Sequence, residues 1–230
     1  DLKNVLIQAA IKLIDECREE TFTIRELASL TGVTHAAAYR HYKSKKEILI
    51  AIAIIGFNKM QNYFDQASEN TTQSGLLTHA NHSSSSNHIN HINHSTRSNH
   101  SAHSPQFPLS QPPQPNQAKQ SLLVAIGMAY VTFAIENPTL FRVMFHSDLN
   151  DCRSEPELGA VGAKTYQTLV NAVVKNISSG TYTNTNEQIF SLAAWSMVHG
   201  ASTLFINGLL KQETNPTNED MRQWIGRAHV

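Results

Sequence analysis

The chain has 230 residues, of which 40% are hydrophobic, and its 18 Lys and Arg side chains balance its 18 Asp and Glu side chains. This length is enough for one or two domains with a sizeable core, and the absence of an uninterrupted apolar run of about 18 residues argues against a membrane span. Cys17 and Cys152 are too few for a disulfide framework or a four-thiolate zinc site, and no secretory signal opens the chain. We therefore expect a cytoplasmic protein whose partners are indicated only by how its charge is distributed.

The N-terminal residues predict a cluster of short helices. Apolar residues recur at helical period from Val5 to Cys17, with charged residues on the opposite face. Thr23 and Glu26 have the spacing of a capping box, which opens a second helix. Gly32 can then adopt the left-handed conformation that ends this helix.

A third, short helix and a longer fourth helix follow. Thr34 can cap a helix that continues to Tyr42, which we expect to be a core residue. Ser44 and Glu47 repeat the capping box at the start of a helix from Lys45 to about residue 66. Two short helices joined by a tight turn that contains Gly are typical of a helix-turn-helix, whose second helix enters the major groove of DNA.

The local charge supports DNA binding by these helices. Residues 31–46 contain Arg40, Lys43, Lys45 and Lys46 and no acidic residue, whereas residues 1–30 contain four basic and six acidic residues. A local excess of positive charge is what attraction to phosphate requires. We therefore predict a three-helix DNA-binding domain over residues 1–57, with a connecting helix to about residue 67.

The segment TIRELASLTGVT from Thr23 to Thr34, together with YRHYKSKKEIL from Tyr39 to Leu49, resembles the DNA-binding domain of TetR-family transcriptional regulators. The resemblance spans roughly residues 5–57. It implies an all-α homodimeric regulator, a repressor that binds a palindromic DNA operator. Ala38 departs from the family pattern, which usually has a larger aliphatic residue there, so we expect looser packing beneath the recognition helix.

The resemblance also implies which residues contact DNA. The start of the recognition helix faces base edges, and neighbouring side chains hold the phosphate backbone. The implied DNA-binding residues are Arg25, Thr34, His35, Ala36, Ala37, Tyr39, His41 and Lys45. Because Ala36 and Ala37 offer only apolar contacts, hydrogen-bonded base readout falls to Arg25, Thr34 and His35.

The middle of the chain has a different composition. From Asn70 to Ala118 the only charged residue is Arg97, and Ser, Asn, His, Gln and Pro dominate. Such a stretch cannot bury enough apolar surface to offset the entropy of ordering it, so we predict a disordered linker over residues 74–117. Seven of the chain's 12 histidines lie there. A metal-responsive regulator that uses this tract is the alternative function, because histidine-rich tracts bind transition metals.

The remaining residues, 118–230, predict a helical ligand-binding and dimerisation bundle. Helices are expected at residues 118–137, 140–145, about 158–177 and about 186–210, and Pro138 ends the first of them. The last helix is apolar on nearly every face. A helix of this kind is buried inside a large core or against a second subunit.

This half resembles the C-terminal domain of the WHG subgroup of the TetR family, which is named for its Trp, His and Gly. The matching segments are Asn137-Pro138, LFRVMF from Leu140 to Phe145, and WSMVHG from Trp195 to Gly200. The resemblance implies a dimer formed by the last helices and a cavity for a small-molecule effector, apolar or aromatic in character, whose binding releases DNA. The implied effector-binding residues are Tyr130, Phe133, Phe141, Met144, Phe145, Trp195 and His199.

The sequence offers no constellation of catalytic residues. The segment GAVGAKT at residues 159–165 has only part of the phosphate-loop pattern and follows no predicted strand. Neither a His-Glu-x-x-His nor a Gly-x-Ser-x-Gly motif occurs. We therefore expect no enzyme, no cofactor and no dedicated metal site.

Overall fold

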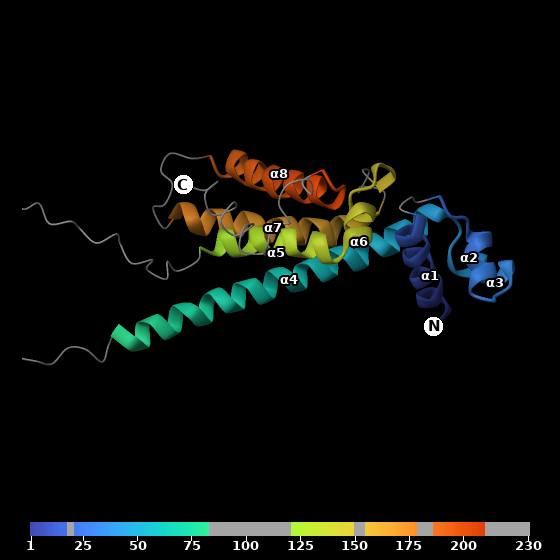
Figure 1. Ribbon diagram of the computed structural model, residues 1–230, viewed down its shortest axis with the longest axis horizontal. Helices are drawn as coiled ribbons and strands as arrows, with labels where there is room; N and C mark the ends of the chain where they lie inside the picture. Colours follow the sequence, from blue (N-terminus) through green and yellow to red (C-terminus); the bar gives the residue numbers. More distant parts are fainter. Residues whose placement is uncertain (18–20, 83–120, 150–154, 179–185, 210–230) are drawn as a thin grey trace, which may run out of the picture.

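The computed structural model describes residues 1–17, 21–82, 121–149, 155–178 and 186–209. Regular structure in these residues is helical throughout, which confirms the predicted all-α fold. The elements are α1 (Leu2–Cys17), α2 (Ile24–Leu30), α3 (His35–His41), α4 (Lys45–His82), α5 (Leu122–Glu136), α6 (Pro138–Met144), the 3₁₀ turn η1 (Ser147–Leu149), α7 (Pro156–Ser178) and α8 (Glu187–Ile206). Helices α1 to α3 form a group at one end, and α4 runs from this group along the bundle of α5 to α8 (Figure 1).

The predicted caps define the helix-turn-helix. The Thr23 hydroxyl accepts a hydrogen bond from the Glu26 N–H at 3.2 Å, and the Glu26 carboxylate accepts one from the Thr23 N–H at 2.7 Å. Gly32 has a φ of +69°, the left-handed conformation that a turn requires here. The Thr34 hydroxyl then caps α3 by accepting from the Ala37 N–H. These local signals set the angle at which α3 leaves α2.

The core of the N-terminal domain lies beneath α3. Ala38 is fully buried, and Tyr42 is only 7% exposed, which confirms the expectation that Tyr42 is a core residue. The first turns of α4 complete this core with Ile48, Leu49 and Ile52. Helix α4 therefore belongs to the N-terminal domain at its start and packs against the helical bundle along its later turns.

Helix α4 is longer than the sequence predicts. It was expected to end near residue 67, with a linker from residue 74, yet it continues to His82. Residues 74–82 contain no proline, and extending an existing helix costs little compared with starting one. The first nine residues of the predicted linker are therefore helical, and the rest of it, residues 83–117, lies outside the described residues.

The corner between α5 and α6 holds the bundle to α4. Pro138 begins α6, and the two helices are bent by 107° at this point. The Lys59 ammonium donates to the Asn137 side-chain oxygen at 2.6 Å, and the Tyr63 hydroxyl donates to the Glu136 carboxylate. Two polar contacts thus attach this corner to one stretch of α4.

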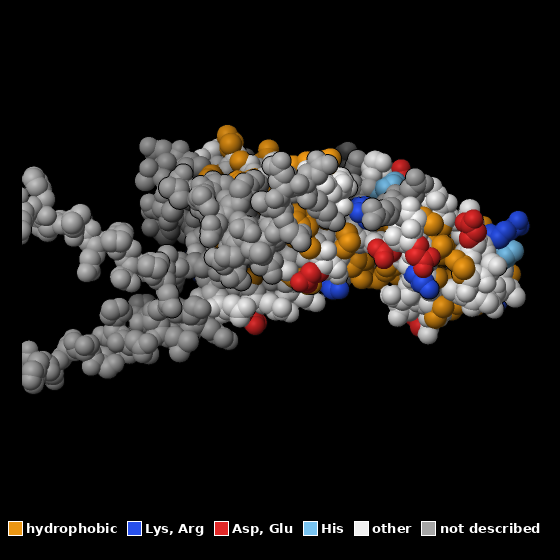
Figure 2. Space-filling model, in the orientation of Figure 1, with side chains coloured by type: hydrophobic (Ala, Val, Ile, Leu, Met, Phe, Trp, Pro, Cys, Tyr) orange, Lys and Arg blue, Asp and Glu red, His pale blue; other side chains and the backbone are white. Residues whose placement is uncertain are grey.

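Helix α8 buries only one narrow face within the single chain. Its buried residues are Ser191, Ala194, Val198 and Ser202, small or medium residues that allow close approach to α5 and α7. Hydrophobic side chains remain exposed along its outer edge (Figure 2). Among the described residues, α8 is the one unbroken helix that is long and apolar enough to cross a membrane. A helix at a subunit interface has the same apolar composition.

Candidate DNA interface and effector cavity

The predicted DNA-binding residues are brought together at the tip of the N-terminal domain. They lie on α2, on α3 with its N-cap, and at the start of α4. Arg25, Thr34, His35, Ala36 and Tyr39 are exposed, and Ala37, His41 and Lys45 are half-buried. Cationic and histidine side chains are visible at this end of the molecule, far from α8 (Figure 2). The arrangement presents α3 outward with no acidic side chain in residues 31–46.

Two of the lysines near α3 have structural partners that the sequence did not reveal. The Lys45 ammonium lies 5.6 Å from the centroid of the Phe22 ring, a cation–π contact. The Lys43 ammonium donates to the Tyr39 carbonyl at 2.8 Å, near the end of α3. Lys43 therefore stabilises the C-terminal end of the recognition helix, while Arg40 and Lys46 are exposed.

A cavity of about 390 Å³ lies in the bundle between α4, α5 and α7. Its size falls within the usual range of small-molecule sites. Four of the seven predicted effector residues line it, namely Tyr130, Met144, Phe145 and Trp195. The cavity is therefore assembled partly from the expected side chains.

The other three predicted effector residues do not line the cavity. Phe133 is fully buried and packs edge-on against Tyr63. Phe141 and His199 stand behind the cavity wall, where Phe141 contacts the rings of Tyr130 and His199. Helical spacing placed these residues on the correct elements, but close packing directs Phe133 and Phe141 into the core around the cavity, and His199 is half-buried beside them.

Most of the remaining wall comes from helices that the sequence analysis did not connect with the cavity. Helix α4 contributes Phe57, Met60 and Phe64, and α7 contributes a face that includes Gly162 and Tyr166. The spacing of the three α4 residues is helical, so a signal was present in the sequence. The segment 159–165, which partly resembles a phosphate loop, is a turn of α7, and it supplies Gly159, Gly162, Ala163 and Thr165 to the wall.

The buried Tyr130 and the half-buried His199 form an uncharged pair. The Tyr130 hydroxyl lies 2.8 Å from His199 Nδ1. Burial raises the pKa of the Tyr130 phenol well above its ordinary value, although the nearby indole of Trp195 acts in the opposite direction. Burial lowers the pKa of His199. Both side chains are therefore neutral near pH 7, and this pair adds no charge to the cavity.

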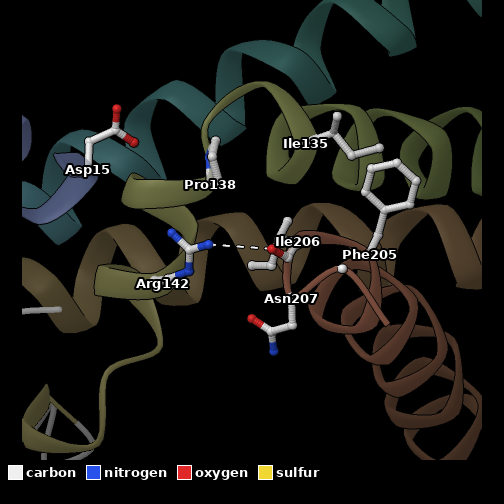
Figure 3. Close-up of a pocket in the computed structure, with 8 residues that line it drawn as sticks. Asp15, Ile135, Pro138, Arg142, Phe205, Ile206 and Asn207 are labelled. Carbon is white, nitrogen blue, oxygen red and sulfur yellow. Dashed lines mark hydrogen bonds between the residues drawn. The ribbon is translucent and has the colours of Figure 1, made fainter. Parts of the chain in front are cut away.

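A second pocket, of about 400 Å³, lies where α1 meets α6 and the end of α8 (Figure 3). The Thr139 hydroxyl donates to the Asp15 carboxylate at 2.7 Å, which joins α6 to α1. The Arg142 guanidinium donates to the Ile206 carbonyl at 3.4 Å, which joins α6 to the end of α8. Helix α6 therefore contacts both the N-terminal domain and the outermost helix of the bundle.

Within the described residues, no group of three or more His, Cys, Asp or Glu side chains is placed to hold a metal ion. The histidine-rich tract after His82 lies outside them.

Two family models match the chain. Residues 6–52 match the model described as bacterial regulatory proteins of the tetR family, and residues 123–225 match a tetracycline repressor-like C-terminal domain. Together they account for about two thirds of the 230 residues. The chain belongs to the TetR family of transcriptional regulators. No curated protein matches it at a significant level.

Solved structures, among them that of a TetR-family regulator, share this fold. PfmR, a TetR-family regulator from Thermus thermophilus, aligns with a TM-score of 0.61 at 15% identity and covers 98% of this chain and 96% of its own. The ketosteroid transcriptional regulator KstR2 of Mycobacterium tuberculosis aligns with a TM-score of 0.58 at 10% identity, and the alignment covers 100% of this chain and 93% of KstR2. A protein of unknown function from Rhodococcus sp. RHA1 aligns with a TM-score of 0.67 at 18% identity, and the alignment covers 100% of this chain and 92% of the Rhodococcus protein. The family and its named neighbours are regulators, which agrees with the expectation that the chain is no enzyme.

Proposed function

We propose that this TetR-family protein is a cytoplasmic repressor that binds a palindromic operator as a homodimer and leaves it when a small molecule binds. The observation that carries the DNA-binding part is the outward-facing α3, which is capped by Thr34 and lies in a segment, residues 31–46, that has four cationic and no acidic side chains. A helix presented in this way can enter the major groove, and a two-fold dimer would address two half-sites.

Fluorescence anisotropy of the purified protein against DNA from its own upstream region tests this proposal. We expect saturable binding at two subunits per site, about 10³-fold tighter than to a scrambled duplex. Equal and steeply salt-dependent binding to both duplexes would contradict specific recognition at this DNA, because it would reflect phosphate attraction alone.

Arg25 and Lys164 provide a matched pair for this assay. Both are exposed cations, but Arg25 lies on α2 beside the recognition helix and Lys164 lies on α7. Arg25→Ala should weaken operator binding about tenfold or more, as expected when a base or phosphate contact is lost. Lys164→Ala should leave it unchanged, and an equal effect of the two variants would argue against the proposed interface.

The homodimer is supported by the outer face of α8. Ile189 is 68% exposed, Leu192 is 54% exposed and Leu204 is 43% exposed, on a helix with only four buried residues in the single chain. Exposed apolar side chains gathered on one face of a helix are typical of an interaction site. A second copy of the chain related by a two-fold axis can cover it with the same surface.

Leu192→Glu tests this interface. The substitution places a charge on the apolar face of α8, so we expect monomers in sedimentation and a large loss of operator affinity. Val5→Glu changes a comparably exposed residue on α1 and should remain dimeric. A Leu192→Glu protein that still sediments as a dimer would place the interface elsewhere.

The effector role is supported by the position of α4. Phe57, Met60 and Phe64 form one wall of the cavity, and the beginning of the same helix is packed into the core of the N-terminal domain. A ligand that moves this wall would shift the DNA-binding domains relative to each other. We also propose the WHG subgroup, on the basis of Trp195, His199 and Gly200.

Operator release measured by anisotropy provides a screen for effectors. Trp195→Ala should weaken the response to a compound found in this screen while operator affinity stays the same, because Trp195 lines the cavity and lies far along the chain from α3. Equal loss of response and operator affinity would show that Trp195 serves folding and not ligand binding.

A further inference from the structure

The pocket between α1, α6 and the end of α8 carries one charge of each sign. Among its described lining residues, Asp15 on α1 is the one acid and Arg142 on α6 is the one base (Figure 3). Its volume of about 400 Å³ falls within the usual range of small-molecule sites. It shares no lining residue with the effector cavity, so it is a separate site.

The Arg142 guanidinium uses little of its hydrogen-bonding capacity. A guanidinium has five N–H donors in a planar fork. Within the part of the chain that the structure describes, Arg142 makes one hydrogen bond, to the Ile206 carbonyl at 3.4 Å, and no ion pair. The side chain is half-buried, in a pocket whose wall also contains Ile135 and Phe205. Free donors in such a wall favour a carboxylate, which the fork can bind through two parallel hydrogen bonds.

The Asp15 carboxylate is held in position but is not neutralised. The buried Thr139 hydroxyl donates to one of its oxygens at 2.7 Å. The nearby Lys12 of the same helix pairs with Glu16 instead, and Asp15 has no cationic partner among the described residues. Asp15 and Arg142 also form no ion pair with each other, so the pocket presents two separate charges without counter-ions.

These two charges determine which ligands the pocket prefers. A simple carboxylic acid would be attracted by Arg142 and repelled by Asp15, and a simple amine would be attracted by Asp15 and repelled by Arg142. A molecule that carries both an ammonium and a carboxylate gains both attractions. An apolar side chain on the same molecule can contact Ile135, Pro138 and Phe205.

We propose that this pocket binds a small zwitterion of the amino-acid class with an apolar side chain, whose carboxylate pairs with Arg142 and whose ammonium pairs with Asp15. The site is independent of the effector role proposed for the other cavity. Because Asp15 belongs to the DNA-binding domain and Arg142 to the bundle, the bound zwitterion stabilises the arrangement in which these two charges face one ligand.

The test uses four compounds that share a phenyl ring, each measured against the full-length protein at neutral pH by isothermal titration calorimetry. L-phenylalanine and L-β-homophenylalanine are zwitterions whose charges differ in separation by one methylene group, phenylpropionate is an anion and phenethylammonium is a cation. We expect at least one zwitterion to bind about tenfold more tightly than either single ion, since a hydrogen bond to a charged group contributes a factor of this order. A single ion that binds as tightly as both zwitterions would overturn the proposal, as would no saturable binding of either zwitterion at millimolar concentration.

Asp15→Asn assigns the ammonium contact. The amide oxygen can still accept from the Thr139 hydroxyl, so the variant removes the charge and keeps the contact between α1 and α6. The zwitterion should bind about tenfold more weakly and phenylpropionate more tightly, because its repulsion by Asp15 is gone. A damaged fold would weaken both ligands. An unchanged preference for the zwitterion would overturn the proposal.

Glu16→Gln is the matched control, because it removes the neighbouring carboxylate of α1, which does not line the pocket. It should leave the preference for the zwitterion unchanged, and an effect equal to that of Asp15→Asn would overturn the role of Asp15.

Arg142→Met assigns the carboxylate contact. This variant keeps an apolar stem and removes the guanidinium, so the zwitterion should bind more weakly and phenethylammonium more tightly. If it does not fold, because the hydrogen bond to the end of α8 is also lost, Arg142→Lys replaces it. That variant keeps the charge without the planar fork, so the zwitterion should bind severalfold more weakly and phenethylammonium as before. Unchanged zwitterion binding in the variant that folds would overturn the role of Arg142.

Trp195→Ala separates this pocket from the effector cavity, which Trp195 lines. The preference for the zwitterion should persist in this variant. Its loss here, together with its retention in Asp15→Asn, would place the zwitterion in the effector cavity and overturn the proposal.

Discussion

At the scale of single residues, two glycines on facing helices have opposite surroundings. Gly56 on α4 is so close to α6 that an added Cβ would lie 2.5 Å from the Met144 sulfur, whereas at Gly162 on α7 the nearest atom would be in ordinary contact at 3.7 Å. Replacing a helical Gly by Ala favours the helix by about 1 kcal/mol. At Gly56 this gain is opposed by overpacking, which costs about 1–3 kcal/mol in a filled core.

We therefore expect Gly162→Ala to raise the free energy of unfolding by about 1 kcal/mol, and Gly56→Ala to lower it by about 1 kcal/mol. Chemical denaturation of the two variants measures both changes in one experiment. Stabilisation by Gly56→Ala would mean that Met144 can move away without loss, and hence that the contact between α4 and α6 is loose.

His199 should make stability depend on pH. Burial lowers its pKa below the ordinary value of 6.5, so the unfolded chain binds a proton more readily than the folded one. The stabilisation is fully present above about pH 6.5 and declines as the pH falls towards the lower pKa of the folded state. His199→Gln lacks this titration, and the other histidines are common to both proteins.

The free energy of unfolding, measured between pH 7.5 and pH 5.5, should therefore fall more in the natural protein than in His199→Gln. Parallel profiles would show that His199 titrates normally in the folded state and that its ring is accessible to water.

At the scale of elements, the helix-turn-helix was predictable because its signals are local. The capping box at Thr23, the glycine turn and the cap at Thr34 each act within four residues, and the structure has them where they were expected. At Ser44 the hydroxyl accepts from the Glu47 N–H as expected, but the Glu47 carboxylate accepts from the Lys43 N–H, so the second half of that box is made one residue earlier. The walls of the cavity were not predictable to the same degree. A helical pattern shows that Phe57, Met60 and Phe64 share a face, but it does not show that this face meets both α5 and α7.

Helix α6 is the element that joins the parts of the molecule. Its Thr139 hydroxyl donates to Asp15 on α1, and its Met144 lines the cavity. Thr139→Val keeps the shape of the side chain and removes this hydrogen bond. Because Asp15 is exposed and can bond to water instead, we expect a modest loss of about 1 kcal/mol in the free energy of unfolding.

The loss should be concentrated in α1. Hydrogen exchange in peptides that cover residues 2–17 should be faster in Thr139→Val, with α7 unchanged. Thr71→Val is a suitable control, because the Thr71 hydroxyl donates only within its own helix, to the Ala67 carbonyl at 2.8 Å. Similar hydrogen-exchange rates in α1 of both variants would show that the hydrogen bond from Thr139 to Asp15 does not stabilise the contact between α6 and the N-terminal domain.

At the scale of the whole molecule, the two halves are held together without the histidine-rich tract. Glu136 and Asn137 at the end of α5 contact Tyr63 and Lys59 of α4. The 15 residues of α5 lead back along α4 by about 22 Å at 1.5 Å per residue. The start of α5 therefore lies beside the later turns of α4, so a long connection between them is not needed to close the fold.

Replacing residues 83–117 by an eight-residue Gly/Ser linker should thus preserve the fold, since such a linker has a typical span of about 16 Å and loop entropy changes slowly with length. We expect sedimentation and operator affinity to match those of the natural protein within about threefold. The same variant tests the role of the five histidines that lie within residues 83–117. If Zn²⁺ or Ni²⁺ at sub-micromolar concentration alters the operator affinity of the natural protein but not of the variant, the tract is a metal sensor. Weak metal binding that has no effect on operator affinity would leave the small-molecule cavity as the site of regulation.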